Sequence, residues 1–152
     1  MKLMSIVIIP ARGGSKRIKN KNLLNFYGKP LIAYSIIAAR KSKLFKRIIV
    51  STDSKKIKKI SEKYGAEVPF IRPKSISGDK TKAQDVIKHC IKYLSRRKVK
   101  FKYVCCIYPT APLVQVKDLK KGFKKLKKWS YIFSACKFEK SVLRYFTIKK
   151  NG

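Results

Sequence analysis

Acidic residues are scarce in this sequence. Seven Asp and Glu stand against 40 Lys and Arg in 152 residues, which gives a formal net charge of +33. No D-x-D pair occurs among the seven, although Mg²⁺ prefers oxygen ligands, carboxylates above all. We therefore assign no metal ligand within these residues.

Ligands for zinc are also few. The sequence has one histidine, His89, and four cysteines that form no C-x-x-C pair. A structural zinc site needs four such ligands at suitable spacing, so we expect none. We predict buried, reduced thiols instead. The cysteines are Cys90, Cys105, Cys106 and Cys136.

No apolar run approaches the ~20 residues that cross a bilayer. The apolar stretch near the N-terminus extends only from Leu3 to Ile9, and Pro10-Ala11-Arg12 follows it without a small-residue cleavage pattern. We interpret this stretch as a buried first strand rather than a signal peptide. We accordingly expect a cytoplasmic protein without a membrane partner.

The excess of lysine has two interpretations. It can mark a surface for nucleic acid or an anionic membrane, or it can cover the solvent faces of helices. We favour the second, because lysines such as Lys55, Lys56, Lys58 and Lys59 lie on polar faces of predicted helices. No helix-turn-helix, RRM or zinc signature appears. A basic nucleic-acid-binding module remains the alternative from another class, and it predicts salt-dependent binding to any DNA or RNA.

Strand-like and helix-like patterns alternate along the chain. Continuous apolar runs predict strands at 5–9, 47–51, 68–71, 103–108, 131–136 and 143–148. Apolar steps of three and four predict a helix that begins at Pro30, a second that starts near 55 and is ended by Gly65, and two more over 83–94 and 119–126. The alternation implies a Rossmann-like α/β fold, with a mostly parallel sheet and helices on both faces. Ligands bind at the carboxyl ends of such strands, which selects the loops 11–22, 72–81 and 109–112.

The end of the sequence carries a turn signal. Asn151-Gly152 follows an apolar stretch and is typical of a hairpin turn. Because no returning strand follows, we expect one α/β domain over residues 1–152 that stops in mid-fold.

The first loop combines glycine with positive charge. Residues 10–22 read PARGGSKRIKNKN. Two glycines let the backbone approach a ligand and turn its amides toward an anion, and cations can neutralise a triphosphate. The spacing fits neither a Walker A loop nor G-x-G-x-x-G. The candidate phosphate ligands are Arg12, Ser15, Lys16 and Lys21.

This loop resembles the opening signature of the CMP-sugar-acid synthetases, or acylneuraminate cytidylyltransferases. The resemblance continues in order over nearly the whole chain. The matching blocks are GKPL at 28–31, IVSTD at 49–53, GAEVPF at 65–70 with Arg72-Pro73, D-x-T at 79–81, and YPTAP at 108–112. The resemblance implies the fold of the nucleotide-diphospho-sugar transferases.

Within this family, several blocks are most similar to the pseudaminic acid cytidylyltransferases. They are Cys106-Ile107-Tyr108 with Thr110-Ala111-Pro112, then Phe133-Ser134 and Arg144. Pro109 is similar to the sialic acid branch, and Glu139-Lys140-Ser141 departs from a proline-rich segment. We expect pseudaminic acid as the sugar, with N-acetylneuraminate or legionaminate as alternatives. An enzyme for a neutral sugar 1-phosphate would show a longer glycine loop and an aspartate where Tyr108 and Pro109 stand.

The resemblance implies roles for residues in three loops. The catalytic cations on the CTP phosphates would be Arg12, Lys16 and Lys21, with Ser15, Gly13 and Gly14 beside them. The cytidine would be recognised by Pro10, Ala11, Arg12, Asn22 and Arg72, in a pocket shaped by Asp79 and Thr81. The sugar side would be lined by Tyr108, Pro109 and Thr110, and Arg144 would face the sugar acid's carboxylate or the phosphate. From the residues alone, Asp53, Asp79 and Thr81 have a simpler interpretation as helix caps.

The implied reaction is in-line attack by the sugar's anomeric hydroxyl on the α-phosphorus of CTP, which releases pyrophosphate. Such catalysis consists mainly of positioning and charge stabilisation, with Mg²⁺ bridging phosphates. In the family, metal-binding aspartates and part of a homodimer interface come from a later segment, beyond residue 152. We therefore expect this chain alone to bind CTP weakly and to turn over poorly.

Overall fold

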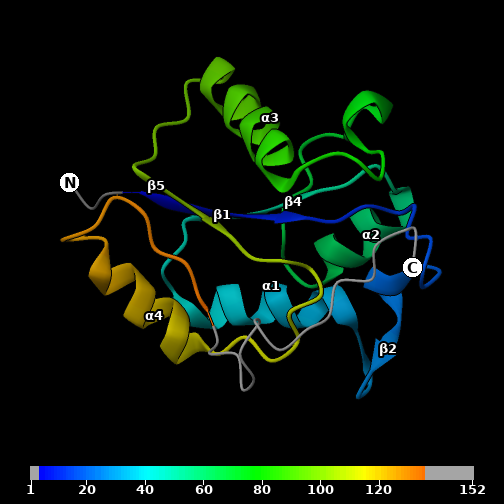
Figure 1. Cartoon of the computed structure of the whole chain (residues 1–152), viewed down its shortest axis with the longest axis horizontal. Coiled ribbons are helices and arrows are strands. Elements are labelled where there is room, and N and C mark those ends of the chain that lie inside the picture. Colours follow the sequence, from blue (N-terminus) through cyan, green and yellow to red (C-terminus); the bar gives the residue numbers. More distant parts are fainter. Residues whose placement is uncertain (1–3, 136–152) are drawn as a thin grey trace, which may run out of the picture.

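Three parallel strands form the central sheet of the computed structural model, which describes residues 4–135. β1 (Ser5–Pro10) lies between β4 (Arg47–Ser51) and β5 (Tyr103–Cys106), as Figure 1 shows. The side chains from Ile6 to Ile9 are completely buried, because this apolar run is covered on both faces. The expected parallel sheet is confirmed.

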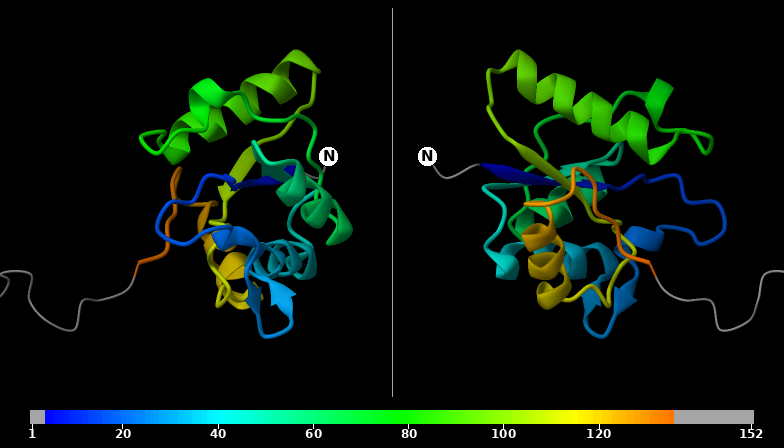
Figure 2. Two further views of the ribbon diagram at one scale, coloured as in Figure 1. Left: turned by 90° about the vertical axis from the view of Figure 1, so that its right-hand side faces the viewer. Right: turned by 60° about the vertical axis from the view of Figure 1, so that its left-hand side comes forward.

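Helices cover both faces of this sheet (Figure 2). α3 (Ala83–Arg96) lies on one face, and α1 (Leu31–Ser42) and α4 (Val116–Lys125) lie on the other. α2 (Lys55–Lys63) follows β4 and contacts α1. This arrangement confirms the predicted Rossmann-like architecture.

Alternation along β1 divides the core into two layers. Val7 and Ile9 pack in the cluster that includes α1, whereas Ile6 and Ile8 pack with Leu94 of α3. Successive side chains of a strand point to opposite faces, so one short strand supplies both layers. Each fully buried aliphatic side chain contributes about 1.5–3 kcal/mol, which makes β1 the centre of stability.

Short elements join the larger ones. β2 (Asn25–Phe26) and β3 (Lys29–Pro30) form an antiparallel hairpin, and 3-10 turns span Lys21–Leu23 and Lys74–Ile76. Pro30 was expected inside the first turn of a helix, but it is the residue before α1. Its missing N–H costs nothing at that position.

The N-terminal cap of α2 is Ser54, so the capping role expected for Asp53 is wrong. The Ser54 side chain accepts a hydrogen bond from the Ile57 amide at 3.4 Å. The helix ends before Gly65, as predicted, where φ is 89° and glycine is favoured. Asp53 is thereby left for another partner.

Two predicted strands are wrong within residues 4–135. The segment 68–71 meets the sheet only at Ile71, which forms an isolated bridge to Thr52. Another isolated bridge joins Glu67, just before the segment, to Ile49. Pro69 between them has no amide to donate. Residues 131–135 form no strand, since Tyr131 and Phe133 stay exposed and no neighbour buries them. β5 also ends at Cys106 rather than at Tyr108. The strand expected at 143–148 lies outside the described residues.

The cysteines are only partly as expected. Cys90 is buried, and burial raises the pKa of its thiol to about 11. Cys105 packs against the α1 side of the core, whereas Cys106 is exposed on the outer strand of the described sheet. The prediction of buried thiols is therefore wrong for Cys106.

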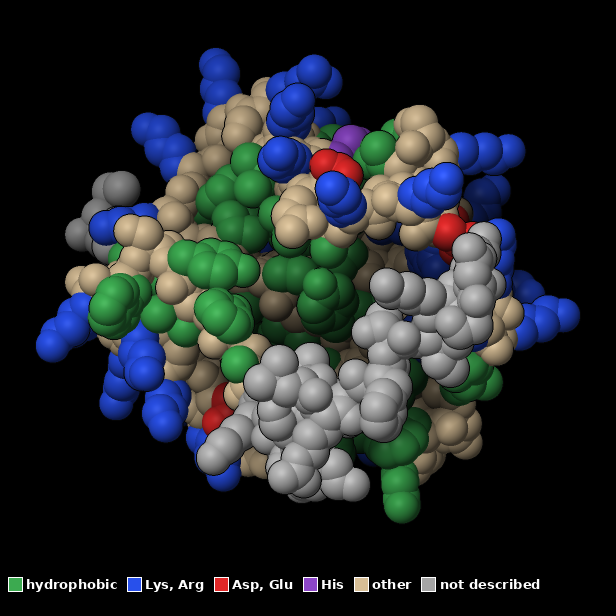
Figure 3. Space-filling view, in the orientation of Figure 1, with side chains coloured by type: hydrophobic (Ala, Val, Ile, Leu, Met, Phe, Trp, Pro, Cys, Tyr) green, Lys and Arg blue, Asp and Glu red, His purple; other side chains and the backbone are tan. Residues whose placement is uncertain are grey.

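Lysine and arginine side chains project from the top, left and right of the outline in Figure 3, while apolar side chains gather toward the centre of the face. On this face the positive charge is dispersed rather than collected in one stripe. Among residues 4–135, the helices are too short or too polar to cross a membrane.

Candidate nucleotide-binding site

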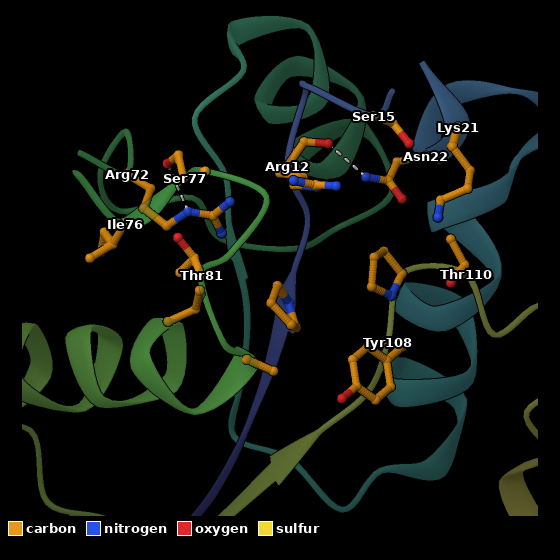
Figure 4. Close-up of a pocket in the computed structure, with 15 residues that line it drawn as sticks. Arg12, Ser15, Lys21, Asn22, Arg72, Ile76, Ser77, Thr81, Tyr108 and Thr110 are labelled. Atoms are coloured by element: carbon orange, nitrogen blue, oxygen red, sulfur yellow. Dashed lines mark hydrogen bonds between the residues drawn. The ribbon is translucent and has the colours of Figure 1, made fainter. Parts of the chain in front are cut away.

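A pocket of about 310 Å³ opens at the carboxyl edge of the sheet. This volume lies at the small end of the range for ligand sites. Its walls come from the first loop, the 72–81 loop, the start of α3 and the segment after β5 (Figure 4). Three loops that are far apart in sequence thus meet at one place, as the strand-end rule predicts.

The pocket brings together most of the predicted residues. Those that line it are Pro10, Arg12, Ser15, Lys21, Asn22, Arg72, Thr81, Tyr108, Pro109 and Thr110. Ala11, Gly13, Gly14, Lys16 and Asp79 do not line it but belong to the same loops, and Arg144 lies outside the described residues. Sequence reasoning did not single out five further lining residues, which are Ile76, Ser77, Gly78, Ala83 and Val86. Their small or apolar side chains carry no chemical signal of their own.

The first loop is held against the end of β4. The Gly13 amide donates to Asp53 Oδ1 at 2.8 Å, and the Ala11 amide donates to the Ser51 carbonyl at 2.9 Å. A β-carbon at position 13 would lie 2.9 Å from Ser54 Cβ, closer than such carbons approach. Position 13 therefore needs glycine because of a close approach. At Gly14 an added β-carbon meets nothing within 4 Å.

An internal carboxylate pairs with two of the cations of this loop. Asp79 pairs through Oδ1 with Arg12 and through Oδ2 with Lys16, whose Nζ lies 2.7 Å away. The hydrogen bonds from Lys16 and then from Arg12 lower the pKa of this exposed carboxyl. The cap expected for Asp79 from the residues alone is thus replaced by an ion-pair role. The pair of cations is arranged to hold an anion.

Arg72 is a buried cation in the opposite wall, with 4% of its surface exposed. Its guanidinium donates to the Ser51 carbonyl at 2.8 Å and to Ser77 Oγ at 3.1 Å, and Nη2 lies 3.9 Å from Asp53 Oδ1. Burial lowers the pKa of Arg72, which shows that the positive charge is held there at a cost. A guanidinium nevertheless stays protonated in proteins.

Asn22 supplies an acceptor whose hydrogen-bonding capacity is unused. It is 4% exposed, and its Nδ2 donates to the Arg12 carbonyl at 2.9 Å (Figure 4). Its Oδ1 has no hydrogen-bond partner among residues 4–135. A buried polar atom without a partner is costly, so a donor from a bound molecule would satisfy it.

The third wall of the pocket, residues 108–110, is anchored to α1. Ser35 of α1 donates to the carbonyl of Tyr108 at 2.8 Å, and Pro109 is buried. Tyr108 is 60% exposed, and Thr110 is also exposed. The backbone of this segment is therefore anchored while its side chains face the opening.

The fold and the pocket define an α/β protein with a ligand-sized pocket at the carboxyl edge of its sheet, and comparisons with known proteins specify the class. The chain belongs to the Cytidylyltransferase family, whose pattern it matches over residues 6–149. It is 40% identical to the pseudaminic acid cytidylyltransferase of Campylobacter jejuni over 152 residues, which are 99% of this chain and 66% of the relative. It is 34% identical to the N-acylneuraminate cytidylyltransferase of Escherichia coli over 143 residues, which are 92% of this chain and 33% of the relative.

A solved structure shows the same fold. It is the structure of CMP:2-keto-3-deoxy-manno-octonic acid synthetase complexed with CTP, with a TM-score of 0.67 at 20% identity. The match covers 82% of this chain and 47% of that one. This chain thus spans 66% of the length of its pseudaminic acid relative and a smaller share of the others.

Proposed function

We propose that this chain is the nucleotide-binding part of a cytidylyltransferase that transfers CMP from CTP to a nine-carbon sialic-acid-like sugar and releases pyrophosphate. The observation that carries the proposal is the meeting of Arg12, Lys21, Asn22 and Arg72 with the Tyr108–Thr110 segment around one pocket. Cations and a buried amide suit a nucleoside triphosphate. Family membership supports the same conclusion.

Pseudaminic acid is the sugar we propose. The relatives that act on it match 99% of this chain, at 40% and 39% identity. A CMP-N,N'-diacetyllegionaminic acid synthase of Legionella pneumophila is 42% identical over 110 residues, which are 70% of this chain and 46% of that relative. Legionaminate and N-acetylneuraminate are therefore the alternatives, and a screen of the three sugar acids separates them.

The residues of this chain act on the nucleotide by position and charge. Arg12, Lys16 and Lys21 would hold the phosphates and stabilise the charge that develops as pyrophosphate leaves. Asn22 Oδ1 would accept a hydrogen bond from the cytidine, and the exposed Tyr108 and Thr110 would face the sugar. The anomeric hydroxyl would attack the α-phosphorus in line with the leaving pyrophosphate.

Mg²⁺ belongs to the proposal, since such an ion bridges phosphates in transfers of this kind. No group of three or more His, Cys, Asp and Glu converges within residues 4–135. Two carboxylates at the first loop, Asp53 and Asp79, already face an amide and two cations. We place the metal ligands, and the homodimer contacts of the longer protein, outside the described residues. We also propose a cytoplasmic location.

Titration with nucleotides tests the proposed function. CTP, ATP, GTP and a short single-stranded DNA are each added to the chain with Mg²⁺ at two salt concentrations. We expect preference for CTP and, for Arg12→Ala, affinity weaker by roughly tenfold, as for loss of a charged hydrogen bond. Arg17→Ala is the matched control, since Arg17 is an exposed cation of the same loop that does not line the pocket. Equal binding of all nucleotides, with DNA binding that collapses at high salt, would favour the nucleic-acid module.

Asp79→Asn should strengthen the binding of CTP and of inorganic pyrophosphate. The carboxylate competes with phosphate for Arg12 and Lys16, and loss of exposed ion pairs of this kind implies a change on the order of twofold to fivefold. Because the pKa of Asp79 is lowered in the fold, its charge is fully present above the ordinary Asp range and is lost only as the pH falls through the lowered pKa. The ratio of wild-type to variant affinity should hence be constant from pH 6 to pH 8. Weaker binding by the variant would show that Asp79 orients the cations rather than competing for them.

A further inference from the structure

Asp53 connects the two charged walls of the pocket without lining it. Its Oδ1 accepts the Gly13 amide at 2.8 Å and lies 3.9 Å from Arg72 Nη2. Its side chain is 25% exposed. Gly13 is 40 residues away in sequence, so this contact exists only in the folded chain. Asp53 belongs to the turn after β4, the element against which the first loop rests.

The contact to Gly13 is the one best suited to fix the loop. Gly13 follows Arg12 directly, and the approach to Ser54 leaves no room for a side chain there. Arg72 has two closer partners, the Ser51 carbonyl and Ser77 Oγ. Loss of Asp53 would therefore leave the Gly13 amide without its acceptor, while the Arg72 hydrogen bonds to Ser51 and Ser77 would stay in place.

We propose that Asp53 is a positioning residue of the nucleotide site, which acts by holding the Gly13 amide and so fixes the Arg12-bearing loop for the triphosphate. This inference rests on the proposed function. If Asp53 acted only through its charge, its removal would strengthen CTP binding, because a carboxylate beside an anion site repels the anion. The sign of a substitution effect consequently separates positioning from simple electrostatics.

Three variants test the proposal in parallel with the wild-type chain. Asp53→Ala removes the acceptor and the charge, and we expect CTP affinity at least tenfold weaker. Asp53→Asn keeps an oxygen acceptor of the same size, and we expect affinity within threefold of wild type. Glu62→Gln is the charge control, since this exposed residue of α2 pairs only with Lys58 among residues 4–135 and is not part of the pocket. Its affinity should be unchanged.

Amide hydrogen exchange without nucleotide gives a readout that does not depend on CTP. In Asp53→Ala the amides of residues 11–16 should exchange faster, while those of α3 keep their protection. Asp53→Asn should restore slow exchange. Affinity of Asp53→Ala equal to or tighter than wild type, unchanged exchange in the loop, or failure of Asn to rescue would each overturn the proposal. If the wild-type chain does not bind CTP, the proposed function fails, and the exchange result still decides whether Asp53 holds the loop.

Discussion

Gly13→Ala is expected to weaken CTP binding by roughly tenfold to a hundredfold. The new β-carbon would lie 2.9 Å from Ser54 Cβ, and both are firmly attached to the backbone. Overpacking of this kind costs about 1–3 kcal/mol. The loop can relieve it only by moving away from β4, which would break the bond from the Gly13 amide to Asp53 and displace Arg12.

Stability should change less than binding in this variant. Apart from Ala11, the first loop lies outside the aliphatic layers around β1, so its glycine segment can shift while the core stays packed. Calorimetric titration with CTP and a denaturant melt measure the two effects separately. A Gly13→Ala chain that binds CTP normally would show that the loop is not held in the observed position when nucleotide binds.

Two other glycines provide matched comparisons. Gly14→Ala adds the same methyl group one residue along, where no atom lies within 4 Å, so its effect on CTP affinity should be much smaller. Gly122→Ala lies within α4, where the added carbon would make an ordinary contact of 3.8 Å with Ile132. Its CTP affinity should equal that of wild type, and its stability should rise by about 0.5–1 kcal/mol because alanine favours helix.

Hydrophobic patterns within single segments of the sequence predicted the main strands and helices of the fold. The apolar run at Ser5–Ile9 and the β-branched run at Arg47–Ser51 match β1 and β4, since a strand buried on both faces needs apolar residues without interruption. Three- and four-residue steps located α3 for the same local reason. The segments 68–71 and 131–135 carry strand-like sequences without a strand, because pairing depends on a partner that the segment itself does not encode.

The site was predictable as a set of loops but not as a set of contacts. Glycine and cations at the carboxyl edge of a parallel sheet indicate phosphate binding, and the pocket contains Arg12, Lys21 and Arg72. The pairing of Arg12 with Asp79 spans 67 residues, and that of Gly13 with Asp53 spans 40. Contacts between residues so far apart in sequence follow from the packing of β1 against its neighbours, and no local spacing encodes them.

Arg72→Met is expected to abolish or strongly weaken CTP binding and to lower stability by about 1–3 kcal/mol, because it leaves buried acceptors unpaired. Removal of the guanidinium abolishes its cost of desolvation but leaves the Ser51 carbonyl and Ser77 Oγ without this donor. Burial lowers the pKa of Arg72, which reflects that cost. The Ser51 carbonyl would keep the Ala11 amide, and Asp53 would keep Gly13.

A buried cation in the wall of a pocket is explained by a ligand that needs its charge. The guanidinium is the charged group of its wall, and a triphosphate or a cytosine carbonyl can use its planar set of donors. Arg47→Met is the control, since Arg47 pairs with Glu67 away from the pocket and its loss should leave CTP affinity unchanged. Denaturant unfolding and CTP titration of both variants decide the matter. Loss of more than about 3 kcal/mol of stability in Arg72→Met, together with normal CTP binding, would make Arg72 a structural residue of the 72–81 loop rather than part of the nucleotide site.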